Sequence, residues 1–182
     1  MKTKDRRYQR TEKRIFKAFY DLFLENDLTD ITVNDISELA DINRSTFYLH
    51  FDDKFALLDA YLYQLLPIAD NFDFNQVNSQ KEVIGKLYDH LTQHLTFFKR
   101  LFNYENYPFA IHSVRTALRQ FFTVNQAYFP EQLGESLEFT IHIRIAGLVA
   151  MVEWYLEHQS HYSREQFIRE TTDMVRLLDN HL

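Results

Sequence analysis

The chain has 182 residues, enough for one medium domain or for a small domain joined to a larger one. Three glycines and three prolines are too few for a turn-rich β-protein or for glycine-rich phosphate loops, and the absence of cysteine excludes disulfides, thiolate nucleophiles and cysteine-based metal sites. The formal net charge of −6 conceals a basic start, because residues 1–17 carry eight Lys and Arg against two Asp and Glu, a balance of +6 that leaves −12 for the remainder.

Two amphipathic helices are expected close to the N-terminus. Apolar residues recur at helical spacing over residues 11–26, and the segment Asp-Leu-Thr-Asp at 27–30 ends this first helix. Thr32 is a suitable N-cap for a second helix over about 33–40. Asp35 then lies in the first turn, where the helix dipole favours an anion.

A third and a fourth helix follow a tight turn. Asp41 tolerates the left-handed conformation that such a turn requires, and Asn43 is a good N-cap for a short third helix. Asp52 or Asp53 is expected to cap a fourth helix over about 54–66.

A polar linker then leads into a second helical part of the chain. Apolar residues at helical spacing predict a fifth helix over 83–95 and, after a kink, a sixth over 98–102. A seventh helix is expected from Pro108 to before Pro130, and an eighth over about 134–158. Ser163 and Gln166 form a capping-box pattern that predicts the start of a ninth helix. The sequence therefore predicts an all-α fold of about nine helices, with domains over 1–54 and 55–182.

Two short helices joined by three residues, the second with small polar and basic side chains, are typical of a helix-turn-helix. In the major groove, Arg44 can bind guanine edges in a bidentate manner and Thr46 can contact a thymine methyl group. Tyr48 and Lys54 suit phosphates. The alternative is a three-helix unit that serves only for packing.

The stretch ITVNDISELADINRSTFYLHFDDKFALL, at 31–58, resembles the DNA-binding signature of the TetR/AcrR family of transcriptional regulators. Asp41 and Ser45 depart from the residues usual in that signature. The resemblance implies a sequence-specific DNA-binding regulator without enzymatic activity or cofactor. It places these residues against DNA, together with the basic arm: Thr32, Asn34, Asn43, Arg44, Ser45, Thr46, Tyr48, His50, Lys54, Arg6 and Arg7.

The C-terminal part, over 140–158 and the capped helix that follows, resembles the sensor domain of a Gram-positive branch that includes regulators of dihydroxyacetone kinase operons. That resemblance implies a homodimer in which the last two helices pair with their symmetry mates; the alternative is an ordinary internal core. The expected interface residues are Ile145, Ala146, Gly147, Val149, Ala150 and Trp154.

Aromatic residues concentrate over 97–129, where they either line a cavity for a small-molecule effector or fill a core. The candidate ligand-binding residues are Phe98, Phe102, Tyr107, Phe109, Phe122 and His142. His90 and His94 share a helix face and form a possible metal pair, but no Glu follows the first His, so no metal site is expected.

We expect a regulator that binds a palindromic double-stranded operator, most simply a repressor released by its effector. Activation, ligand-independent regulation and a helical protein-binding adaptor are the alternatives. The sequence has no run of about 18 apolar residues, so a transmembrane helix and a membrane partner are not expected. The charged first residues lead into no apolar signal core, and the expected location is therefore the cytoplasm.

Overall fold

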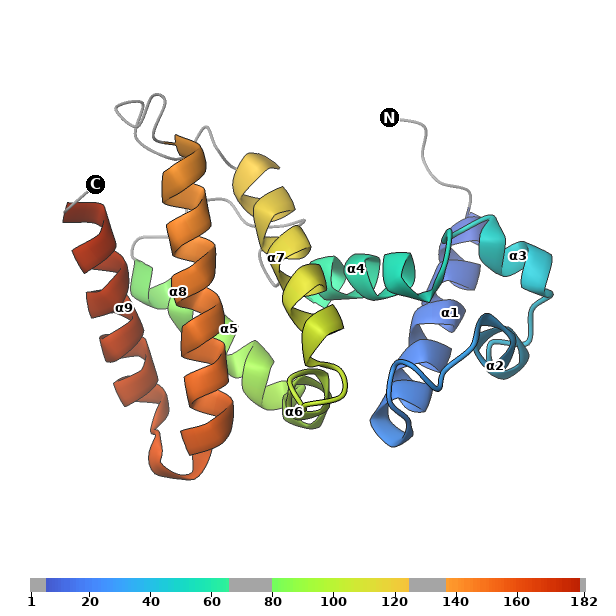
Figure 1. The fold of residues 1–182 in the computed structure, drawn as a ribbon, viewed down its shortest axis with the longest axis horizontal. Coiled ribbons are helices and arrows are strands. Elements are labelled where there is room, and N and C mark those ends of the chain that lie inside the picture. Colours follow the sequence, from blue (N-terminus) through green and yellow to red (C-terminus); the bar gives the residue numbers. More distant parts are fainter. Residues whose placement is uncertain (1–5, 66–79, 125–136, 181–182) are drawn as a thin grey trace.

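The computed structural model describes residues 6–65, 80–124 and 137–180. Within these ranges the chain forms nine α-helices and no strand, which confirms the predicted all-α fold. Figure 1 shows α1–α3 at one end, α8 and α9 at the other, and α4 between them. The helices are α1 Arg6–Glu25, α2 Val33–Leu39, α3 Arg44–Tyr48, α4 Lys54–Leu65, α5 Gln80–Gln93, α6 Leu95–Leu101, α7 Tyr107–Val124, α8 Leu137–His158 and α9 Arg164–Asn180, with a 3-10 turn Gln159–His161 before α9.

Short-range capping sets where the small helices begin. Thr32 caps α2 as predicted, because its Oγ1 accepts the N–H of Asp35 at 3.2 Å while Asp35 Oδ2 accepts the N–H of Thr32 at 2.8 Å. Asp53, rather than Asp52, caps α4: its Oδ1 accepts the N–H groups of Phe55 and Ala56, both at 2.8 Å.

The turn between α2 and α3 also has the predicted conformation. Asp41 has φ of 50°, in the left-handed region that Asp tolerates better than most residues. Arg14 of α1 fixes this turn, since its Nη2 donates to the main-chain oxygen and to Oδ2 of Asp41, both at 2.7 Å. Asn43 occupies the N-cap position of α3, but its side chain makes no capping hydrogen bond.

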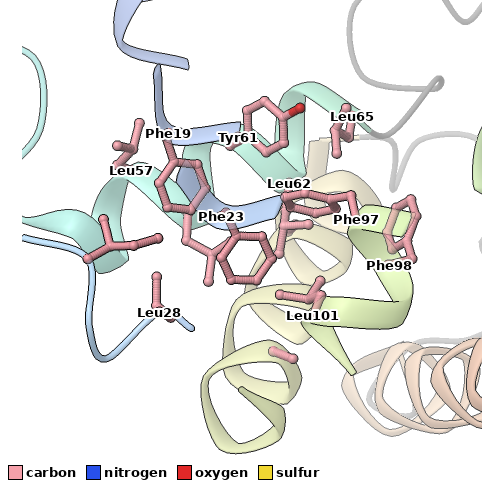
Figure 2. Packing of buried hydrophobic residues seen from close by; sticks show 14 of the residues in the cluster. Phe19, Phe23, Leu28, Leu57, Tyr61, Leu62, Leu65, Phe97, Phe98 and Leu101 are labelled. Atoms are coloured by element: carbon pink, nitrogen blue, oxygen red, sulfur yellow. The ribbon is translucent and has the colours of Figure 1, made fainter. Parts of the chain in front are cut away.

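One aromatic core joins the two ends of the molecule. Tyr61 of α4 lies between Phe19 of α1 and Phe97 of α6, with ring centroids at 5.9 and 5.3 Å, and Phe97 also contacts Phe23 at 5.1 Å. Figure 2 shows these side chains converging from three helices. Truncation of a fully buried Phe such as Phe97 to Ala costs about 3–5 kcal/mol. Helix α4 thus belongs to the core of both predicted domains.

The C-terminal helices build a second layer. Helix α4 packs against α7, α5 against α9, and α8 against both α7 and α9. Pro108 lies in the first turn of α7 as predicted, and Ser163 Oγ accepts the N–H of Gln166 at 3.1 Å at the start of α9. The predicted C-terminal end of the seventh helix and the predicted start of the eighth fall within 125–136, outside the described residues.

Helix α8 is apolar on more than one face. Within the described parts of the chain, Glu138–His161 is the one segment long and apolar enough to cross a membrane, with a mean hydropathy of 1.3. The expectation from the sequence concerned an uninterrupted run of about 18 apolar residues, and this segment contains charged residues, Arg144 and Glu153 among them. The segment packs on α7 and α9, so part of its apolar surface belongs to the core and part faces outward.

Candidate functional site

Helix α3 exposes the residues predicted to contact bases. Phe47 is completely buried and anchors the helix to the core, so the side chains on its other faces point outward. Arg44, Ser45 and Tyr48 are exposed, and Thr46 is partly exposed. Arg44 Nη2 donates to Tyr48 Oη at 3.1 Å, and the guanidinium carbon lies 5.6 Å from the Tyr48 ring centroid. Tyr48 therefore fixes the guanidinium of Arg44 on the exposed surface of α3.

The predicted residues of α2 are also exposed, but both side chains have partners within the protein. Thr32 takes part in the capping box with Asp35, and hydrogen bonding from Thr32 lowers the pKa of that carboxyl. Asn34 Nδ2 donates to Glu38 Oε1 at 2.7 Å. Helix α2 packs next to α3, so Thr32 and Asn34 belong to the same helix-turn-helix as the exposed residues of α3.

The start of α1 lies beside the end of α3. The ring of Tyr8 stacks on His50, with centroids 3.9 Å apart and 29° between the planes. Arg6 and Arg7, in the same turn as Tyr8, are exposed. The stack therefore brings the basic first turn of α1 close to the end of α3 (Figure 1).

Lys54, which the sequence predicts to contact phosphate, makes hydrogen bonds within the protein. Its ammonium donates to the main-chain oxygens of Leu28, Thr29 and Ile31 at 2.7, 3.0 and 2.7 Å. Partial burial lowers the pKa of Lys54, opposed by Asp30 and Asp35. Because an ammonium has three N–H donors, Lys54 clamps the turn between α1 and α2 and has no donor left for DNA.

A small apolar cavity lies between the helices of the second layer. It measures about 60 Å³ and is lined by Leu, Phe, Val and Ala side chains of α4–α8 and by His90. Ligand pockets usually measure about 300–1,000 Å³, so this cavity holds only a very small molecule unless its walls move. Of the six predicted ligand residues, Phe98 and Phe102 line it.

The other four predicted ligand residues do not line this cavity, although Phe122 belongs to the same core cluster as the lining residues Leu118 and Val149. Tyr107 is exposed on α7 and donates to Glu153 Oε1 at 2.6 Å, which raises the pKa of Tyr107. Phe109 packs on Phe55, Phe122 lies in a core cluster with Phe121, and His142 is exposed. The aromatic density of α6 and α7 thus mainly fills the core.

His90 is the cavity residue that the ligand prediction missed. Leu87, one helical turn before His90, and Leu91, directly after it, also line the cavity. A polar residue on an otherwise apolar helix face was the sequence feature that could have indicated its position. Burial, and then the neighbouring His94, lower the pKa of His90 to about 4. Among the described residues no group of three or more His, Cys, Asp or Glu could hold a metal ion.

The predicted dimer residues fall on two faces of α8. Ile145 and Val149 are each 4% exposed and pack against α7, so they belong to the core of the protomer. Ala150 and Trp154 are exposed, and Ala146 and Gly147 are partly exposed. Phe139, 57% exposed, extends the outward face by two turns; the prediction did not include it.

Comparison with known proteins relates the helix-turn-helix to bacterial regulators. Residues 15–61 match the family described as "Bacterial regulatory proteins, tetR family". An uncharacterized HTH-type transcriptional regulator of Bacillus subtilis, YxbF, is 41% identical over 59 residues, covering 32% of this chain and 16% of that protein. DhaS of Lactococcus lactis, an HTH-type dhaKLM operon transcriptional activator, is 36% identical over 99 residues, covering 44% of this chain and 53% of DhaS.

Solved structures extend the likeness over the whole fold. A TetR transcriptional regulator from Streptococcus agalactiae has a TM-score of 0.60 at 23% identity, covering 94% of this chain and 96% of its own. The dihydroxyacetone kinase operon activator DhaS has a TM-score of 0.52 at 21% identity, covering 92% and 93%. At these identities the structures support the fold, whereas the sequence matches cover only part of each relative.

Proposed function

We propose that the chain is a regulator of the tetR family of bacterial regulatory proteins, which it matches over residues 15–61, and that it regulates transcription by binding a specific DNA sequence as a homodimer. The observation that carries this proposal is the α3 surface. Phe47 fixes the helix from below, while Arg44, supported by Tyr48, points outward with Ser45 beside it. A guanidinium held in this way is suited to the O6 and N7 atoms of guanine.

Charge supports DNA as the partner. The chain is acidic overall, with net charge −6, yet the first helix carries Arg6, Arg7, Arg10, Lys13 and Arg14 within nine residues of sequence. The Tyr8–His50 stack holds this helix against the end of α3. Basic side chains in such a place bind phosphates and position the recognition helix. An adaptor for proteins does not need this concentration of charge.

The outward face of α8 supports the homodimer. Phe139, Ala146, Ala150 and Trp154 follow one another at helical spacing, and the small residues between the aromatics allow a second helix to approach closely. An exposed apolar stripe of this kind marks a protein interface. Two-fold symmetry then implies a palindromic operator, with recognition helices about 34–36 Å apart or somewhat more. A regulator of this kind acts in the cytoplasm.

We further propose that a small-molecule effector controls DNA binding and that the unliganded protein is a repressor. The cavity between α4 and α8 supports this, because α4 carries both cavity residues and the core residues beneath α1. Activation is the second candidate function, favoured by the match to DhaS, an activator. A reporter gene behind the protein's own upstream DNA distinguishes them: deletion of the protein raises expression for a repressor and lowers it for an activator.

The experiment that tests the proposed function is a mobility-shift titration of the full chain on the duplex upstream of its own gene, in parallel with a scrambled duplex of equal composition. Sequence-dependent binding that weakens steeply with salt is expected. Equal binding to both duplexes would contradict the proposal and favour the adaptor.

A further inference from the structure

We infer that Leu49 is a further specificity-determining residue at the end of α3, and that it recognises the 5-methyl group of a thymine in the major groove. This inference rests on the proposed function, because it takes α3 as the helix that contacts base edges. It adds an apolar contact to the polar set of Arg44, Ser45 and Thr46, and it names the base that this contact selects.

The exposure of Leu49 is the first observation. Leu49 is 76% exposed, more than any other large aliphatic side chain in the described parts of the chain. Its backbone is helical, with φ of −76° and ψ of −16°, so it continues the turn of α3. Single exposed leucines are common on protein surfaces. The argument therefore depends on where Leu49 lies on the helix.

Helix geometry places Leu49 on the face opposite the buried anchor of α3. Successive residues of an α-helix are about 100° apart around its axis. Ser45 and Leu49, two residues before and two residues after the buried Phe47, therefore both lie about 160° from it. Arg44 and Tyr48 lie on one flank of this face. A helix that approaches DNA with the face opposite its anchor presents Ser45 and Leu49 most directly to the groove.

Of the two macromolecular partners proposed for this chain, DNA is the one that would cover this face. Helix α3 lies at one end of the molecule, whereas α8, which carries the proposed dimer face, lies at the other (Figure 1). The stack of Tyr8 on His50 brings the basic first turn of α1 close to the residue that follows Leu49. Phosphate contacts from that turn would hold the end of α3 against the duplex.

The chemistry of the side chain determines which group on DNA it selects. A leucine side chain neither donates nor accepts hydrogen bonds, so it cannot distinguish the polar edges of the bases. In the major groove, the apolar group that distinguishes one base from the others is the C5-methyl of thymine. Contact between the methyl group and Leu49 removes apolar surface from water on both sides, which is favourable. A cytosine at the same position has no such methyl group.

The test uses the full chain and the upstream duplex, in which the thymines are replaced one at a time by deoxyuridine. This replacement removes the methyl group and leaves the base-pairing edge unchanged, and fluorescence anisotropy gives each Kd. We expect one thymine in each half-site at which replacement weakens binding about fourfold, the effect of losing one buried methyl group. In L49A the same replacement should leave the Kd unchanged, because the methyl group has lost its apolar partner.

Two variants serve as controls. L39A truncates an exposed leucine of α2 and should retain the fourfold effect. L49M keeps an apolar side chain of similar length and should retain part of it. Because Leu49 is exposed, L49A should melt at the same temperature as the parent, which separates a lost contact from misfolding.

The outcomes separate this inference from the proposed function. If the upstream duplex is bound specifically but no thymine is sensitive to replacement, or if replacement has equal effects in the parent and in L49A, the inference is overturned and the proposed function stands. A parent protein that binds the upstream and scrambled duplexes equally would overturn both.

Discussion

The side-chain oxygen Oδ1 of Asn106 accepts the main-chain N–H of Leu28 at 2.8 Å and so joins the loop after α6 to the turn after α1. Asn106 is completely buried, and its Nδ2 donates to Asp27 Oδ1 and to the main-chain oxygen of Arg100, both at 3.1 Å. Arg100 also donates from Nε to the main-chain oxygen of Asn26 at 3.0 Å. This polar joint adds hydrogen bonds to the aromatic packing that connects α6 with α1.

The first prediction concerns this joint. N106A should lower the free energy of unfolding by about 2–3 kcal/mol, because the N–H of Leu28 and the carboxylate of Asp27 lose buried partners. Urea denaturation measures the change. E105A, in the same loop but exposed, is the matched control and should stay within about 0.5 kcal/mol of the parent. Equal effects of the two variants would show that the joint is not stabilising.

The second prediction concerns pH. Burial lowers the pKa of His90 from its ordinary value of 6.5 to about 4 in the folded protein. Between pH 4 and pH 6.5 the unfolded state therefore binds more protons than the folded state. Stability therefore falls as the pH decreases from about 6.5 towards 4. H90Q should lose less stability than the parent between pH 7 and pH 5 in thermal melts. Identical pH profiles of the two proteins would contradict the neutral, buried state of His90.

The third prediction separates the clamp from a phosphate contact at Lys54. K54M keeps most of the aliphatic stem but removes three donors, so we expect a loss of about 1–2 kcal/mol in stability. Because the ammonium is engaged within the protein, the slope of log Kd against log salt should not change. A phosphate-contacting lysine would lower that slope by about 1. K17M, which removes an exposed surface lysine, is the stability control.

The fourth prediction concerns the outward face of α8. A150E places a charge in the centre of the proposed interface and should convert the dimer to monomers at micromolar concentration in sedimentation velocity. Q120E, on an exposed position of α7, should leave the dimer intact. V149A probes the other face: it should lower stability without changing the oligomeric state, since Val149 is buried in its own protomer. A dimeric A150E would place the interface elsewhere.

Local signals in the sequence predicted most of the fold. The cap at Thr32 and the positive φ of Asp41 depend on neighbours within a few residues, and both agree with the structure. Of the two predicted caps of α4, Asp53 is the one observed. Only half of the predicted Ser163–Gln166 capping box is present, because the side chain of Gln166 contacts Glu170. Side-chain contacts that depend on the tertiary structure were harder to predict. Lys54 meets carbonyl oxygens more than twenty residues away, which no local pattern encodes.

The faces of α8 show the same limit. Ile145, Ala146, Val149 and Ala150 are all apolar, so composition does not separate the residues that face α7 from those that face outward. The same limit applies to the predicted ligand residues, because aromatic side chains that could line a cavity can equally fill a core, and Phe109 and Phe122 pack against other aromatic side chains. For α3 the sequence is more informative, because the buried Phe47 determines which faces of the helix are exposed.

The central claim is that α3 reads a DNA sequence through Arg44. Fluorescence anisotropy gives its most direct test, with the Kd of the parent, R44A and R115A measured on the upstream duplex and on its scrambled counterpart. R115A removes an exposed arginine of α7 and serves as the charge-matched control. We expect the parent to prefer the upstream duplex by about a thousandfold or more. R44A should lose about 1–3 kcal/mol on the upstream duplex and little on the scrambled one, and R115A should change neither. Equal losses of R44A on both duplexes, or a parent protein without preference, would contradict the account.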